Sequence, residues 1–334
     1  MKNKILFNTA AVSVVAAIIV WNSPSVFSNS VINLDKNNNK VDTSAVIAAA
    51  KWSNNVTIAL DKEASTFRFQ SNGIPSHGFA QKYLIPKNPN EQPFSNKPAS
   101  AFTVVNSAEF FKETQIDTTI TTAPNYVEKI TSTSLGRIGV ALSGAQIFND
   151  YENMDRSVVA KDDQVIHDHV SFLDECNGHT LVDGTNYHYH GVPVCITSAL
   201  DSADSHSVMI GVLEDGFPVY GNLGLSGTIV TNNDLDECSG HVGATPEFPQ
   251  GIYHYHLTAD EAPYMIDCYH GEIENAAPRG EGGPNFEQVA QALGVSRQAL
   301  IQALGDSMPP DFDAAAKKLK ISVDDLRASM APPQ

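Results

Sequence analysis

The chain carries an internal repeat, and a repeat restricts the fold to a module that can be built twice. Residues 173–179 read LDECNGH, and residues 235–241 read LDECSGH. Each copy is followed by the tetrapeptide YHYH, at 187–190 and at 253–256. Upstream, residues 139–149 match residues 211–221, and Cys195 and Cys268 close the two copies. Four elements in the same order predict a tandem duplication within residues 101–275.

The predicted fold class is mainly β: a tandemly duplicated, disulfide-bonded β module followed by a small α-helical C-terminal unit. Short runs rich in β-branched and aromatic residues, broken by prolines, predict an N-terminal β region over residues 45–100. A Pro- and Gly-containing linker is expected at 276–284. Within 285–334 a second, smaller repeat has apolar residues at helical spacing, which predicts two helix-turn-helix units whose second helices start after Ser296 and Ser322.

The N-terminus has the pattern of a signal peptide over residues 1–28, with Lys2 and Lys4 before an apolar stretch. A polar, flexible lead is expected at 29–44. No later stretch is long and apolar enough to cross a membrane, so no membrane span is expected after signal cleavage. The predicted location is periplasmic or secreted. The formal net charge of -17 argues against a nucleic-acid partner.

Export changes the interpretation of the four cysteines, because disulfides form in oxidising compartments. Cys176 and Cys195 fall at positions in the first copy that match Cys238 and Cys268 in the second. We therefore expect one disulfide within each copy. Thiolate ligation of a metal is the alternative.

The histidines carry the chemistry. In a strand, side chains at i and i+2 share a face, so YHYH places two histidines on one side and two tyrosines on the other. Two imidazoles so placed can bind one metal ion, with a third supplied by a neighbouring segment. The histidine after the turn glycine is the candidate in each copy. The predicted metal ligands are therefore His179, His188 and His190, and His241, His254 and His256.

Two arrangements stay open: one three-histidine site in each copy, or one ion shared between the copies. The alternative to both is that the YHYH strands are structural, with histidines hydrogen-bonded in a packed sheet. Further candidates for the metal site or its surroundings are His167, His169, His270, Asp174 and Asp236. The two aspartates, like Glu175 and Glu237, are equally typical of turns and caps.

Residues 215–221, 236–241, 253–256 and 267–271 together resemble the YHYH-motif family of exported bacterial proteins. The resemblance covers roughly residues 130–272. The first copy departs from the family pattern, because residues 143–146 (SGAQ) stand where a Gly-Phe/Val-Pro segment is usual. The family is defined by its motif, and the resemblance implies export without implying an activity.

Three functions are compatible with these patterns. The first is an exported metal-binding protein that holds copper or zinc as a monovalent or divalent ion. The second is a secreted metalloenzyme, a hydrolase or oxidoreductase, that uses the same site. The third is a non-catalytic surface or adhesion protein. Sequence motifs do not decide whether the protein is an enzyme, since no nucleophile elbow, phosphate loop or dinucleotide fingerprint occurs.

Overall fold

The computed structural model describes residues 40–153, 156–273, 286–304 and 312–330. The predicted signal peptide and the predicted linker lie outside these residues. The described strands are β1 Val56–Asp61, β2 Thr66–Ser71, β3 Lys82–Pro86, β4 Phe102–Asn106, β5 Ile116–Thr121, β6 Tyr126–Ser132, β7 Arg137–Ala141, β8 Gln146–Phe148, β9 Ile166–His167, β10 Val170–Ser171, β11 Gly178–His179, β12 His188–Tyr189, β13 Met209–Leu213, β14 Pro218–Tyr220, β15 Gly240–Gly243, β16 Ile252–His256 and β17 Cys268–Gly271. The described helices are α1 Ser44–Ala49, α2 Ser107–Phe110, α3 Val194–Leu200, α4 Phe286–Leu293, α5 Arg297–Leu304, α6 Phe312–Leu319 and α7 Val323–Met330, with short 3₁₀ turns at Ala99–Ala101, Leu225–Gly227 and Asn232–Asp234.

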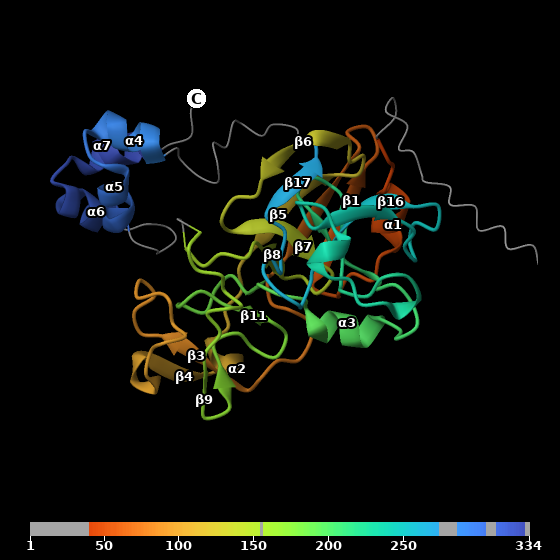
Figure 1. Cartoon of the computed structure of the whole chain (residues 1–334), viewed down its shortest axis with the longest axis horizontal. Helices are drawn as coiled ribbons and strands as arrows, with labels where there is room; N and C mark the ends of the chain where they lie inside the picture. The colour runs from red at the N-terminus through yellow and green to blue at the C-terminus, as the bar shows by residue number, and fades with distance from the viewer. Residues whose placement is uncertain (1–39, 154–155, 274–285, 305–311, 331–334) are drawn as a thin grey trace, which may run out of the picture. The chain divides into compact units, whose positions relative to one another are not determined.

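The fold is mainly β, as predicted, and its centre is an eight-stranded sheet in the order β11-β12-β8-β7-β13-β14-β16-β15. Several of these strands are labelled in Figure 1. The central strands of this sheet are β7 and β13. From β7 outwards the order is β8, β12 and β11, and from β13 outwards it is β14, β16 and β15, so the two halves contain corresponding strands in the same order. The hairpins β7–β8 and β13–β14 are antiparallel, while β8 pairs with β12, and β14 with β16, in parallel.

The central pair joins residues that the repeat makes equivalent. Val140 of β7 lies opposite Val212 of β13 in an antiparallel register. Because a residue lies opposite its own counterpart, the two halves of the sheet are arranged around this pair with pseudo-twofold correspondence. That the two halves arose by duplication stays a prediction. Each half of the sheet contains one copy of the repeated sequence motifs.

A second, three-stranded sheet, β1-β2-β5, covers the middle of the large one. The side chains between the two sheets include Phe67 and Phe69 of β2 with Val140, Val212 and Tyr220. All five are fully buried. Strand β2 pairs with β5, and β3 pairs with β4. Residue 100 is the predicted boundary between the N-terminal β region and the duplicated module. These sheets pair strands from both sides of that boundary.

The YHYH tyrosines lie in the main core. Tyr187, Tyr189, Tyr253 and Tyr255 are all buried there, together with Phe217 and with the first cysteine of each copy. Burying an aromatic side chain of this size contributes about 2 kcal/mol or more to folding. The alternation of a strand then sends the histidines between them to the other face of the sheet.

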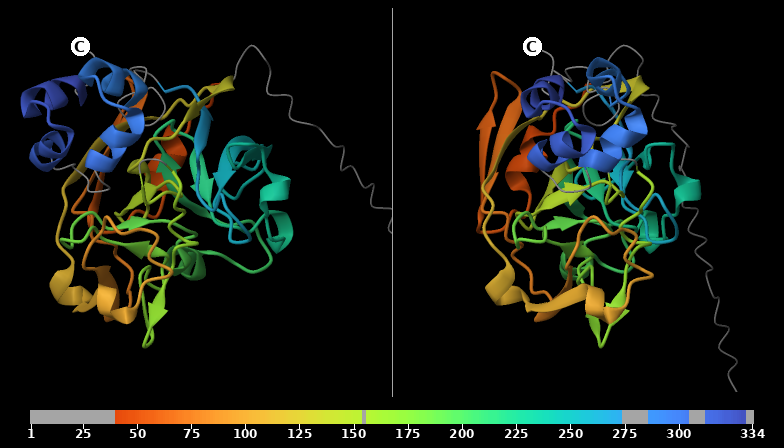
Figure 2. Two further views of the ribbon diagram at one scale, coloured as in Figure 1. Left: turned by 60° about the vertical axis from the view of Figure 1, so that its left-hand side comes forward. Right: turned by 90° about the vertical axis from the view of Figure 1, so that its left-hand side faces the viewer.

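The C-terminal helices have an apolar cluster of their own, which contains Val289, Leu300, Ala316 and Leu326. Helix α4 packs against α5 and α7, and α6 packs against the same two helices. This part of the chain is drawn in blue in Figure 2. Ser322 accepts the backbone N–H of Asp324 and caps α7, as predicted. Among the described residues, no helix has the length and apolar character needed to cross a membrane.

Candidate metal centres

The turn before each site is built the same way in both copies. In the second copy, Asp236 Oδ1 accepts the backbone N–H groups of Cys238 and Gly240 at 2.9 and 3.0 Å. In the first copy Asp174 Oδ1 accepts those of Cys176 and Gly178 at 2.9 and 3.1 Å. These bonds hold a tight turn that leads directly into the strand carrying the histidine. The aspartates thus shape the turn and do not bond the imidazoles of the two clusters.

Strand pairing then brings the turn histidine onto the YHYH strand. His179 of β11 lies opposite His188 of β12, and His241 of β15 lies opposite His254 of β16. The last histidine of each motif follows two residues later on the same face. Each copy therefore gathers its own three predicted histidines, and the structure forms two clusters in place of one shared site.

Backbone carbonyls orient the imidazoles. In the second copy, His254 Nδ1 lies 3.0 Å from the Ile252 carbonyl oxygen, and His256 Nδ1 lies 2.6 Å from that of Gly221. In the first copy, His188 and His190 make the matching bonds to Asn186 and Asn149, at 2.6 and 2.7 Å. A carbonyl oxygen only accepts hydrogen bonds, so Nδ1 carries the proton in each neutral ring. Each Nε2 therefore presents a lone pair, which is the form that binds a metal ion.

The second cluster contains a fourth histidine that the sequence patterns did not indicate. His206 precedes β13, and its Nε2 lies 3.3 Å from His254 Nε2. The Nε2 atoms of His241 and His256 each lie 3.1 Å from the same atom. His206 Nδ1 faces the Ser207 carbonyl oxygen at 2.7 Å, so its Nε2 also presents a lone pair. Nothing in the repeat identifies His206, because the first copy has no histidine at the matching place.

The first cluster contains a carboxylate that the sequence patterns also missed. Glu152 Oε1 lies 3.2 Å from His179 Nε2 and 3.4 Å from His190 Nε2. Both Glu152 Oε1 and His179 Nε2 are buried, and neither has a hydrogen-bond partner of acceptable geometry. Glu152 thus places a carboxylate oxygen beside two of the three imidazoles of this cluster. Glu152 lies in the segment that follows β8. The matching segment of the second copy has no acidic residue at that position.

Burial favours the neutral form of the histidines in the two YHYH motifs. Burial, with neighbouring histidines adding to it, lowers the pKa of His188 and of His254 well below the usual value. Burial also lowers the pKa of His190 to about 4 and that of His256 to about 3. For Glu152, burial raises the pKa, but the attraction of His179 and His190 in their protonated forms, with a hydrogen bond from protonated His179, lowers it by more, and the net direction is downward. The two histidines of each YHYH motif are therefore neutral at neutral pH and can bind a metal ion.

The other candidates lie outside the two clusters. His167 and His169 belong to the β9–β10 hairpin, where His167 Nε2 lies 3.3 Å from the Lys97 carbonyl oxygen. His270 lies in β17; its Nδ1 faces the Val127 carbonyl oxygen, and its Nε2 is 3.8 Å from both Asp236 and Glu237. Glu175 and Glu237 are exposed. His270 forms a separate group of possible ligands with Asp236 and Glu237, and among the described residues none of these candidates is grouped with the ligand atoms of either cluster.

The disulfides are those predicted. Cys176 is bonded to Cys195 and Cys238 to Cys268, and no cysteine is free. Each bond anchors the turn that precedes a cluster. The cysteines are therefore not thiolate ligands in this state.

The copies differ on the tyrosine face. Tyr255 donates a hydrogen bond to the buried Asp215 at 2.6 Å, whereas the equivalent Tyr189 lies 2.8 Å from Ser143 and 2.5 Å from His77 Nε2. Ser143 belongs to the segment in which the first copy departs from the family pattern. Strands β7 and β8 nevertheless form on either side of it.

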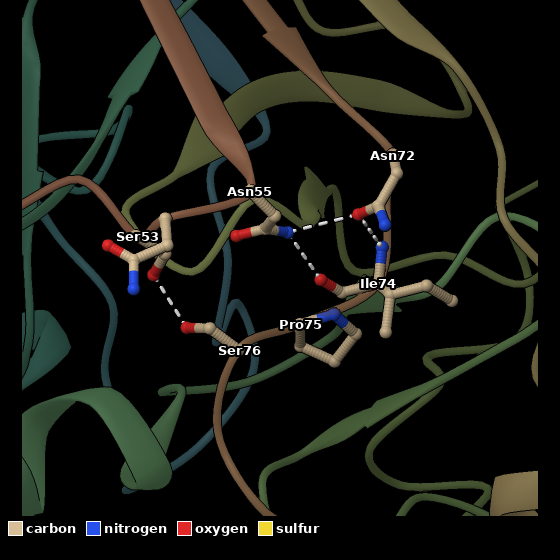
Figure 3. Close-up of a pocket in the computed structure, with 7 residues that line it drawn as sticks. Ser53, Asn55, Asn72, Ile74, Pro75 and Ser76 are labelled. Carbon is tan, nitrogen blue, oxygen red and sulfur yellow. Dashed lines mark hydrogen bonds between the residues drawn. The ribbon is translucent and has the colours of Figure 1, made fainter.

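One cavity of about 410 Å³ has a different character. It is lined by hydroxyl, amide and apolar side chains, among them Asn55, which donates to Asn72 Oδ1 at 3.1 Å and to the Ile74 carbonyl oxygen at 2.7 Å (Figure 3). Its lining has no histidine, cysteine or acid. The clusters, and not this cavity, therefore carry the candidate chemistry.

The fold and the sites define a class: a disulfide-bonded, mainly β protein with a buried histidine cluster in each half of its central sheet. The family model described as YHYH protein matches residues 117–231 and 226–271, so this part of the chain is a YHYH domain. No curated protein and no solved structure matched the chain.

Proposed function

We propose that this protein binds transition-metal ions, copper or zinc, outside the cytoplasm, with one ion at each histidine cluster. The observation that carries the proposal is the convergence of Nε2 lone pairs in the second cluster. Nδ1 of His206, His254 and His256 each faces a carbonyl oxygen, so no proton is left to bridge the Nε2 contacts of 3.1 and 3.3 Å. Without a cation, these lone pairs would repel one another in a buried site.

The spacing supports the same conclusion. Zinc binds imidazole nitrogen at about 2.0–2.1 Å, and a tetrahedral ion at that distance separates its ligand atoms by about 3.3–3.4 Å. The three Nε2 separations from His254 are 3.1 to 3.3 Å, close to that value, and the ligand atoms of all four histidines lie within 4.8 Å of one another. A small inward or outward movement of the rings would complete the coordination.

Export is part of the proposal. Two disulfides favour an oxidising compartment, in agreement with the signal-like pattern of residues 1–28. A binding role is preferred to a catalytic one because three of the four histidines in the second cluster are buried and His241 is partly exposed.

The test is the number of ions per chain after chelation and reloading with Zn²⁺, measured by elemental analysis. The double variant His254→Gln with His256→Gln should lose one ion, and so should His188→Gln with His190→Gln. The matched control is His167→Gln with His169→Gln, which changes two histidines outside the clusters and should keep the wild-type count. If both cluster variants retain the wild-type count and affinity, the histidines are structural and the proposal is wrong.

A further inference from the structure

The two clusters are alike in their repeated histidines but differ in one member each. The first is completed by Glu152, which lies on the chain after β8, and the second by His206, which lies before β13. These two residues come from segments that do not correspond in the repeat. They give the two sites different charges.

In the first cluster the carboxylate is in direct contact with the imidazoles. Its Oε1 lies within 3.4 Å of two Nε2 atoms, and the Glu152 side chain is 11% exposed. Its Oε1 is buried and has no hydrogen-bond partner. Glu152 Oε1 therefore adds a carboxylate oxygen next to the possible ligand group of His179, His188 and His190.

In the second cluster every member is an imidazole. The carboxylates of Asp201 and Glu247 act on His206 through space, and those of Asp234 and Asp236 act on His241 in the same way, while the Asp234 backbone carbonyl also accepts a hydrogen bond from His241. In the part of the chain that the structure describes, no ion pair joins an acid to a nitrogen of this cluster. The ligand set is therefore neutral.

We propose that the two metal sites differ in their preference for ion charge: Glu152 makes the first a three-histidine, one-carboxylate site for a divalent ion such as Zn²⁺, while His206 makes the second a four-histidine site with a relatively greater preference for monovalent Cu⁺. This rests on the proposed function. Zn²⁺ fills the first site before the second.

The physical reason is the cost of burying net charge. A divalent ion with three imidazoles and one carboxylate leaves one positive charge in a buried site, while four imidazoles leave two. Replacing the divalent ion by a monovalent one at the second site again leaves one. A site without the carboxylate therefore binds a divalent ion more weakly, and the loss is smaller for a monovalent ion. The imidazoles themselves are suited to both zinc and copper.

The first experiment measures each site alone. Mature protein with His254→Gln and His256→Gln retains the first site, and protein with His188→Gln and His190→Gln retains the second. Each is titrated with Zn²⁺, and with Cu⁺ under argon, against a chromophoric chelator. We expect Zn²⁺ to bind the first site at least about tenfold more tightly, and the ratio of Cu⁺ to Zn²⁺ affinity to be higher at the second.

The second experiment exchanges the distinguishing residues. Glu152→His should lower the Zn²⁺ affinity of the first site, and His206→Glu should raise that of the second, a gain that a purely structural role would not produce. Melting followed by circular dichroism, and the unaltered site in the same molecule, report on folding. Equal Zn²⁺ affinities at the two sites, or no gain with His206→Glu, overturn the charge assignment and leave metal binding intact. Failure of wild-type protein to bind either ion overturns both proposals.

Discussion

The hydroxyl of Tyr253 donates a hydrogen bond to Asp236 Oδ2 at 2.9 Å, on the opposite face of β16 from His254. Tyr187 makes the same bond to Asp174 at 2.7 Å in the first copy. The other oxygen of each aspartate holds the turn that carries the first histidine of the cluster. The tyrosines of the motif therefore support the turn, while the histidines between them form the site.

Replacing Tyr253 with Phe should separate these two roles. The variant loses one hydrogen bond to an aspartate and should be less stable by about 1–2 kcal/mol. It should still bind the wild-type number of ions, because the ring stays packed and the imidazoles are unchanged. Denaturant unfolding and metal analysis of one preparation give both values. A lost ion, without a change in stability, would mean that the hydroxyl acts in the site itself.

The metal-free protein should lose stability on acidification through its buried histidines. The pKa of His190 is about 4 in the folded protein, because burial outweighs the attraction of Glu152, against an ordinary value of 6.5. Between these values the unfolded chain binds more protons than the folded one, so this group's contribution falls as the pH falls. From pH 7 to pH 5 the loss from His190 alone is about 2 kcal/mol.

The measurement compares wild type with His190→Gln, both free of metal, by urea unfolding at pH 7, 6 and 5. The variant should gain about 2 kcal/mol relative to wild type across this range. A comparison is required because burial raises the pKa of Asp174 and of Asp215 to about 6, which acts in the opposite direction. A constant difference between the two proteins at all three pH values would contradict the prediction.

Each disulfide should stabilise the fold and hold a cluster turn. Cys176–Cys195 and Cys238–Cys268 span 19 and 30 residues. Loop closures of this length contribute about 3 kcal/mol each on the chain-entropy estimate. Cys238→Ser with Cys268→Ser should therefore lower the free energy of unfolding by about that amount and weaken metal binding at the second cluster more than at the first. The corresponding first-copy variant is the matched control and should show the reverse order of effects.

Removing the C-terminal helices should leave the β module intact. Helices α4 to α7 bury Leu300, Ala316 and Leu326 among themselves, in a cluster separate from those of the sheets. We expect deletion of residues 284–334 to preserve the cooperative melt of the module and both metal affinities. Loss of the melt or of a metal ion on truncation would place the helices within the β module's folding unit.

Much of the site could be predicted from the sequence because it rests on local rules. The alternation of a strand assigns His254 and His256 to one face and Tyr253 and Tyr255 to the other, whatever surrounds them. Repetition of the cysteines at matching places was sufficient to pair them correctly. The helical spacing at the C-terminus predicted α4 to α7 for the same reason, since it depends on neighbours three and four residues apart.

The remaining features depend on contacts between distant segments. Whether the copies share one ion or form two clusters follows from the order of strands, which places β12 and β16 on opposite sides of the central β7–β13 pair. Glu152 and His206 have no periodicity or motif that marks them, because each reaches its cluster from a loop. The sequence by itself determined which histidines face together, because the pleat of a strand is local. Only the tertiary structure decided that one cluster includes a carboxylate and the other a fourth imidazole, because loop positions are set by the packing of the whole sheet.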